Sequence, residues 1–139
     1  MTRRNVYVDR IASAWLIQRR IDPEARFRFV AALGYVPAAG EIRFDMYEAE
    51  YTHVGNSCTF EVLASMFVPD DPAVAAISEV IHDIDFKEMR FARPETAGVR
   101  LLINGIVSNH ADDDARLERG FAFFDDLVAG FNARMERSD

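Results

Sequence analysis

The 139-residue sequence predicts an α+β fold, in which a small N-terminal sheet with one helix is covered by a mainly helical C-terminal half. Three observations support this prediction. Short segments rich in β-branched and aromatic residues lie before residue 54, whereas apolar residues recur at helical spacing after residue 58. The chain contains neither an internal repeat nor a low-complexity linker, so we expect one domain over residues 1–139.

The first half of the chain is expected to contain one helix among four short strands. Asp9 is expected to cap this helix, which spans residues 10–20, because an aspartate carboxylate can accept a free helix N–H. Arginine and phenylalanine alternate before Val30, which is typical of a half-buried strand. The four strands are rich in β-branched and aromatic residues or alternate in polarity, and we predict them at residues 5–9, 26–30, 42–46 and 49–53.

The second half is expected to contain four helices. The first covers residues 59–67, and the third begins near Pro94. The second begins at an aspartate cap followed by Pro72, whose missing N–H costs nothing at the first helical position. The last runs from about residue 112 to residue 135, and the three aspartates at its start suit the positive end of a helix dipole. The buried stripe of the second helix is expected to be Val74, Ile77, Ile81 and Ile84.

The last helix carries a long apolar seam. Its residues follow one another in alternating steps of four and three, which places them on one side of a helix. The seam can pack on its own domain, or it can pair with a partner helix and form a homodimer. The residues of the seam are Leu117, Phe121, Phe124, Val128, Phe131 and Met135.

The composition limits the classes of partner. The net charge of −7 argues against a nucleic-acid reader, because such proteins usually carry a basic patch. No stretch approaches the roughly 20 apolar residues of a membrane span, and the N-terminus lacks the apolar core of a signal peptide. The single cysteine excludes an intramolecular disulfide. We therefore expect a cytoplasmic protein that binds neither nucleic acid nor a membrane.

Residues 50–63, EYTHVGNSCTFEVL, bring three metal-capable side chains close together. His53 is expected at a strand end and Glu61 in the first turn of the next helix, so that the two flank one cavity. Cys58 lies between them. It is either a small buried residue at a helix start, or a thiolate that the helix N-terminus activates to bind metal or to react with an oxidant.

A second group, His82 and Asp85, lies on one side of a predicted helix, because the two residues are three apart. Imidazole and carboxylate ligands together suit zinc, iron(II) or manganese. We therefore predict that His53, Glu61, His82 and Asp85 hold a divalent metal ion. The residue types leave an alternative open, in which His53 is a partly buried structural imidazole and His82 caps a surface group or pairs with Asp85 there.

Four segments occur in order along essentially the whole chain: RNVYVDRIASAWLIQRRIDPEARFRFV, EYTHVGNSCTFEVL, IHDID and RLERGFAFFDDL. Together they resemble the C-terminal domain of the ChrB chromate resistance proteins. The opening segment, with Asp9-Arg10 and Asp22-Pro23-Glu24, is the most specific part, and the THxGxxCTFE run is the next. The resemblance implies a link to bacterial chromate resistance, in a family usually encoded near a chromate efflux transporter.

The full-length proteins of that family carry an additional N-terminal region associated with chromate-dependent regulation. The present sequence lacks that region, so we do not expect a transcriptional role for it. The family has also been described as exported, but the absence of a signal peptide favours the cytoplasm here.

Two functional hypotheses follow. In the first, the chain is a metal-binding domain with an enzymatic or redox role that handles a small oxyanion such as chromate. Arg10 and Cys58 are then the candidate cofactor-binding residues, and Arg10 orients Asp85 or holds the anion through bidentate contacts. In the second, the chain is a non-catalytic sensor or interaction domain. Chromate would then bind an arginine-rich pocket, for which the candidates are Arg4, Arg10, Arg26 and Arg28.

Overall fold

The computed structural model describes residues 1–31, 33–34, 36–46 and 49–138. The chain is mostly helical, with a small two-stranded parallel sheet near the N-terminus, in agreement with the predicted α+β class. In chain order the elements are β1 (Thr2–Arg3), α1 (Val8–Leu16), a π-helical turn η1 (Ile17–Ile21), β2 (Phe29–Val30), α2 (Thr59–Phe67), α3 (Pro72–Phe86), α4 (Thr96–Asn109) and α5 (Asp113–Ser138).

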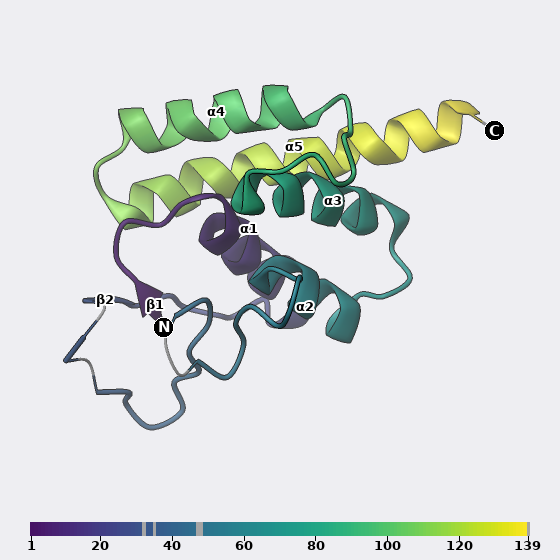
Figure 1. Cartoon of the computed structure of the whole chain (residues 1–139). Helices are drawn as coiled ribbons and strands as arrows, with labels where there is room; N and C mark the ends of the chain where they lie inside the picture. Colours follow the sequence, from purple (N-terminus) through teal and green to yellow (C-terminus); the bar gives the residue numbers. More distant parts are fainter. Residues whose placement is uncertain (32, 35, 47–48, 139) are drawn as a thin grey trace.

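The helices form two groups that pack on each other (Figure 1). Helices α4 and α5 lie side by side with α3 next to them, and α1 and α2 pack below this group. The strands and the loops between β2 and α2 gather at the other side of the molecule, at the lower left of the view. Helix α1 contacts α2, α3 and α5, which places it at the centre of the fold.

The core forms around the indole of Trp15 in α1. Its ring centroid lies 6.5 Å from that of Phe60 in α2 and 5.7 Å from that of Phe124 in α5. The indole N–H donates to Asp125 Oδ1 at 2.8 Å, so the one polar atom of this buried side chain is satisfied.

The seam of α5 packs inside its own chain. Leu117, Phe121, Phe124 and Phe131 are buried in the core, and Val128 and Met135 pack against it. This is the intramolecular alternative for the seam, and the homodimer through this helix stays a prediction.

Helix α3 begins as predicted. Asp71 Oδ1 accepts hydrogen bonds from Ala73 N at 3.0 Å and Val74 N at 3.2 Å, and Pro72 occupies the first turn. The helix ends at Lys87, which adopts a left-handed conformation with φ of 54°. All four residues of the predicted stripe are buried, but Asp83 is also buried, at 1% exposure. Helical spacing turns Asp83 away from that stripe and predicts that it faces water, and this prediction is wrong.

The predicted strand at residues 5–9 is wrong. Val8 and Asp9 already belong to α1, and the strand lies earlier, at Thr2–Arg3, where it pairs in parallel with Phe29–Val30. The predicted strands at 42–46 and 49–53 reduce to one bridge between Phe44 and Tyr51. A strand requires a continuous partner, whereas the partners here change from residue to residue.

The hydrogen bonds of this region show the irregular pairing. Phe44 N donates to Met1 O at 3.0 Å, Asp45 N donates to Tyr51 O at 2.7 Å, and the Thr2 hydroxyl donates to Phe44 O at 2.8 Å. The chain is thus pinned beside β1 without forming a longer ladder.

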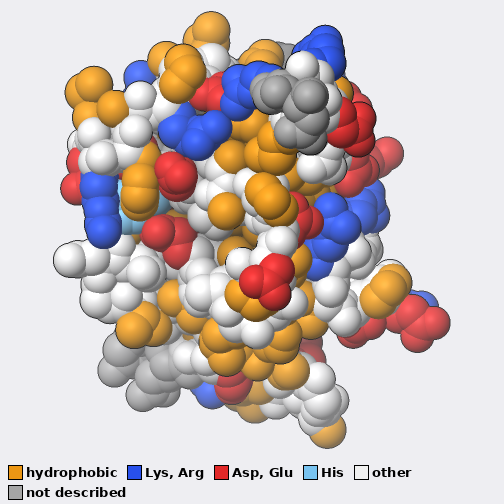
Figure 2. All heavy atoms as spheres, turned by 90° about the vertical axis from the view of Figure 1, so that its right-hand side faces the viewer, with side chains coloured by type: hydrophobic (Ala, Val, Ile, Leu, Met, Phe, Trp, Pro, Cys, Tyr) orange, Lys and Arg blue, Asp and Glu red, His pale blue; other side chains and the backbone are white. Residues whose placement is uncertain are grey.

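The surface mixes charged and apolar side chains. On the face shown in Figure 2, the basic side chains are separated by acidic and hydrophobic ones. Within the described ranges, no helix combines the length and apolar character that crossing a bilayer requires.

Candidate metal centre

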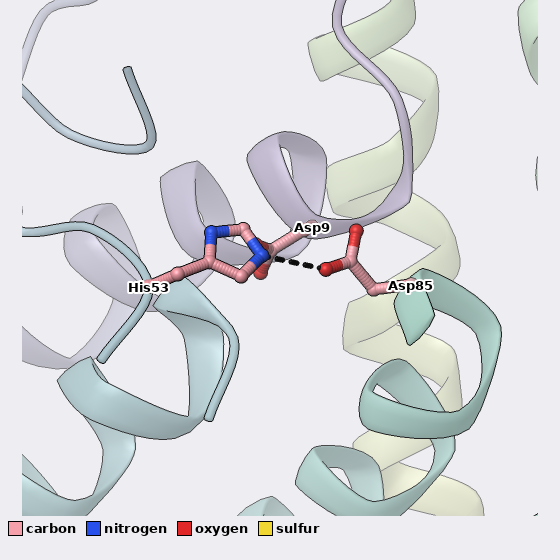
Figure 3. A group of neighbouring side chains, drawn as sticks. All are labelled: Asp9, His53 and Asp85. Carbon is pink, nitrogen blue, oxygen red and sulfur yellow. Dashed lines mark hydrogen bonds and ion pairs between the residues drawn. The ribbon is translucent and has the colours of Figure 1, made fainter. Parts of the chain in front are cut away.

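Asp9, His53 and Asp85 meet from three different elements (Figure 3). Asp9 lies in the first turn of α1, and Asp85 lies in the last turn of α3. His53 lies in the loop before α2, next to a tight turn in which Val54 N and Ser57 O are 3.0 Å apart. Gly55 in this turn has a φ of 58°, a left-handed conformation that favours glycine.

The imidazole of His53 is surrounded by carboxylates. Its Nε2 lies 2.7 Å from Asp85 Oδ2 and 3.7 Å from Asp9 Oδ2, and its Nδ1 lies 3.4 Å from Asp45 Oδ1. One donor atom from each of Asp9, His53 and Asp85 lies within 4.8 Å of the others. Donors this close together can share one ion, because metal–ligand bonds to nitrogen and oxygen are about 2 Å long.

We predicted that Asp9 caps the helix that follows it, but it caps α2 instead. The N-cap of α1 is Tyr7. The Asp9 carboxylate accepts hydrogen bonds from Phe60 N at 2.9 Å and Thr59 N at 3.1 Å, which are free N–H groups at the start of α2. The type of interaction was predicted correctly and the partner helix was not, because sequence proximity cannot show which helix start lies opposite the carboxylate.

Asp45 forms the wall of the site. Its backbone φ of 49° is left-handed, which aspartate tolerates better than most residues. The Thr59 hydroxyl donates to Asp45 Oδ1 at 3.1 Å. Arg10 Nε lies 3.4 Å from Asp45 Oδ2 and donates to the Asp45 carbonyl at 3.3 Å. Arg10 therefore pairs with Asp45 and not, as proposed from the sequence, with Asp85.

These groups open into a cavity of about 260 Å³. It combines the carboxylates and His53 with two guanidinium groups and one phenol. Its lining residues are Arg3, Tyr7, Asp9, Arg10, Asp45, His53 and Asp85.

The site carries more carboxylate charge than it can easily hold. Burial, reinforced by the nearby charges of Asp45 and Asp85, raises the pKa of Asp9 to about 7. Burial alone would lower the pKa of His53, but its hydrogen bond to Asp85 and the charge of Asp9 outweigh burial and raise it. The clustered carboxylates thus favour an added positive charge, whether it comes from protons or from a metal ion.

The other two predicted ligands form a separate group. His82 is only 1% exposed, and its Nδ1 lies 2.5 Å from Glu61 Oε1 while its Nε2 contacts Glu88. The ring of Phe86 contacts both imidazoles, with centroid distances of 5.7 Å to His53 and 4.6 Å to His82. The structure thus joins His53 to Asp85 and His82 to Glu61. The alternative in which His82 pairs with Asp85 on the surface is wrong.

Cys58 is fully buried in the core. Burial raises the pKa of its thiol, and the charge of Asp9 adds to this shift. Its backbone N–H donates to Glu61 Oε1 at 3.1 Å. These contacts favour the interpretation as a small buried residue over that of an activated thiolate.

The four arginines proposed for an anion pocket do not come together. Arg10 lines the site, but Arg26 lines a different cavity of about 550 Å³. Arg28 forms an ion pair with Glu41, with an N–O distance of 2.6 Å. Arg4 does not line the site cavity, whereas Arg3, which was not among the four candidates, does.

The residues that we predicted for the site did not include Asp9, Asp45 or Glu88. Asp9 stands in the most specific segment of the family resemblance, next to Arg10, and that position was the available signal. Asp45 and Glu88 lie in loops outside any recognisable motif, so nothing in the sequence singled them out.

Comparison with known proteins identifies one family that the chain resembles. The family described as "ChrB, C-terminal domain" matches residues 1–131. Protein ChrB of Cupriavidus metallidurans is 33% identical over 137 residues, and the match covers 98% of this chain but 41% of that protein. The chain therefore spans less than half the length of this relative. No solved structure matches the chain.

Proposed function

The chain belongs to the ChrB C-terminal domain family, and we propose that it is a divalent-metal-binding domain that handles a small oxyanion. The link of the family to chromate resistance makes chromate the first anion to test. The observation that carries the proposal is the convergence of Asp9, His53 and Asp85 within 4.8 Å at the wall of a cavity that also contains Arg3 and Arg10.

The donor set suits a metal of intermediate hardness. One imidazole and two carboxylates match zinc, iron(II) or manganese, and further positions on the ion would face the cavity. Asp9 is well suited as a ligand, because its hydrogen bonds to Thr59 N and Phe60 N fix its orientation. Asp45 lies 3.4 Å from His53 Nδ1 and can orient the ring by accepting its N–H.

The metal also determines whether the site can bind an anion. Without it, the three carboxylates repel an oxyanion, and Arg10 is already paired with Asp45. With a divalent ion bound, the balance of charge at the cavity becomes favourable, and Arg3 and Arg10 lie where they can add hydrogen bonds. The anion would thus bind after the metal.

Binding is better supported than reduction. Reduction of chromate to chromium(III) requires more electrons than one iron or manganese ion supplies, so turnover would need an external reductant. A redox or enzymatic role would be a further property of the loaded site, beyond the binding that the described side chains support.

Metal binding is tested with protein that has no histidine tag and has been treated with a chelator. Zinc, manganese and iron(II) are added in separate titrations, and bound metal is measured by elemental analysis after dialysis. We expect His53→Gln and Asp85→Asn to weaken binding at this site by at least about tenfold. The matched controls are His110→Gln, at a residue that contacts the Ile106 carbonyl, and Asp126→Asn, on the exposed side of α5.

Two results would contradict this proposal. One is the absence of bound metal in the wild-type protein with all three ions. The other is equal loss of binding in the control variants and the site variants.

The non-catalytic sensor remains the second candidate, and the presence of Arg3 and Arg10 in the cavity favours it. Chromate titration of metal-free and metal-loaded protein distinguishes the two. We expect chromate to bind the loaded protein alone and to bind more weakly after Arg10→Gln. Chromate binding by metal-free protein that survives His53→Gln but not Arg10→Gln would support the sensor instead.

A further inference from the structure

The end of α3 carries a second group of metal-capable side chains. One donor atom from each of His82, Asp83 and Glu88 lies within 4.8 Å of the others. His82 and Asp83 belong to α3, and Glu88 follows the left-handed Lys87 that ends the helix. The loop turns back on the helix, because Glu88 N donates to Asp83 O at 3.0 Å.

The ring of His82 is already oriented as a metal ligand would be. Its Nδ1 lies 2.5 Å from Glu61 Oε1, and its Nε2 faces Glu88. Histidines that bind metals through one ring nitrogen commonly donate the other N–H to a carboxylate. The rings of Phe86 and Phe91 pack against the imidazole, with centroid distances of 4.6 Å and 5.2 Å, and hold it in place.

Asp83 supplies an independent observation that points to a cation at this place. Its Oδ2 accepts hydrogen bonds from Phe91 N at 3.0 Å and Ala92 N at 2.9 Å. Its Oδ1 is buried and has no hydrogen-bond partner in the described part of the chain. An unpaired buried carboxylate oxygen is costly, and a cation next to it would remove that cost.

Two members of the group, His82 and Glu88, line a cavity at the surface, whereas Asp83 is buried. The cavity has a volume of about 280 Å³ and is lined by Asn56, His82, Phe86, Glu88 and Arg90. Arg90 packs over the ring of Phe91 and brings one positive charge to the rim. Three carboxylates, of Glu61, Asp83 and Glu88, outnumber that charge.

We propose that His82, Asp83 and Glu88 form a second divalent cation site, which binds an ion such as zinc and is separate from the centre at His53. Glu61 orients His82 through its contact with Nδ1, and Asn56 lines the same cavity as His82 and Glu88. Phe86 stands between the two imidazoles, so the two ions would not share a ligand. The competing explanation is a protonated His82 held between Glu61 and Glu88 with no metal at all.

Zinc titration by calorimetry separates these explanations, again with untagged and metal-stripped protein. Asp85→Asn removes a ligand of the first centre, and we expect this variant to retain one zinc-binding event. Adding Glu88→Gln to that background should weaken the remaining event by at least about tenfold, and adding Glu61→Gln should weaken it by about 10- to 100-fold. Glu118→Gln, an exposed residue of α5, is the matched control.

The outcomes are distinguishable. If Asp85→Asn abolishes all zinc binding while the wild type binds, the second site is overturned and the first stands. If Asp85→Asn changes nothing and Glu88→Gln alone abolishes binding, the first site fails and the second stands. Histidine NMR adds a direct readout: zinc should remove the Nε2 proton of His82, and an unchanged His82 signal at saturating zinc would support the protonated histidine without metal.

Discussion

At the scale of single residues, Asp9 performs two tasks with one carboxylate. It caps the start of α2 through Thr59 N and Phe60 N, and it faces His53 across the candidate centre. Capping favours the charged form of Asp9, whereas burial and the neighbouring carboxylates favour its neutral form. The second effect is larger, and it raises the pKa of Asp9 to about 7. The fold therefore holds in a fixed position a carboxylate whose charged form is destabilised by burial.

This cost predicts a pH dependence of stability in metal-free protein. In the unfolded chain the pKa of an aspartate is about 4, whereas burial in the fold raises the pKa of Asp9 to about 7. The folded state binds the proton more tightly, so the contribution of Asp9 to stability is largest below the unfolded value and is lost as the pH rises towards the folded value. Urea unfolding across this range, in chelator, should show wild type losing stability relative to Asp9→Asn.

Saturating zinc should reverse the trend, because a metal competes better with protons as the pH rises. In metal-free protein His53 adds to the loss of stability as the pH rises through its folded pKa, because that pKa is also raised in the fold. A difference between wild type and Asp9→Asn that stays constant over the whole range would contradict the assignment.

At the scale of elements, the contact of α1 with α5 depends on one glycine. A Cβ at Gly120 would overlap Ile11 Cγ2, and Ile11 is fully buried, so its side chain has little room to move. This close approach brings the two helices together where Trp15 packs against Phe124.

We expect Gly120→Ala to lower the free energy of unfolding by roughly 1–3 kcal/mol, because overpacking outweighs the better helix propensity of alanine. Gly130→Ala is the matched control on the same helix, where an added Cβ meets nothing within 4 Å. That variant should be neutral or more stable by up to about 1 kcal/mol. Urea denaturation of both variants checks the pair, and a Gly120→Ala protein as stable as wild type would show that α1 and α5 pack less closely.

The elements that could be predicted are those whose signals are local. The cap at Asp71 with Pro72 and the stripe of α3 lie within one stretch of sequence, so they were predicted correctly. The strands were not, because the pairing of Thr2–Arg3 with Phe29–Val30 and the single bridge at Phe44 depend on partners far away in the chain.

At the scale of the whole molecule, the four predicted ligand residues do meet metal-capable partners, but they belong to two separate groups instead of one. His53 with Asp85, and His82 with Glu61, do meet across long sequence separations. Their division into two groups follows from the position of Phe86, which no periodicity could show. The α5 seam could be predicted as apolar, but only the packed chain shows that it faces α1, α3 and α4.

The three donors of the centre at His53 come from positions 9, 53 and 85, which lie far apart along the chain. An ion shared by them would act as a cross-link that has to open before α1 and α3 can separate. Zinc should therefore slow the rate of unfolding as well as shift its equilibrium. Digestion by a nonspecific protease in excess should then become slower with zinc in wild type and less so in His53→Gln, in which only the site at His82 can still bind zinc. The difference between the two proteins therefore reports whether the centre is filled.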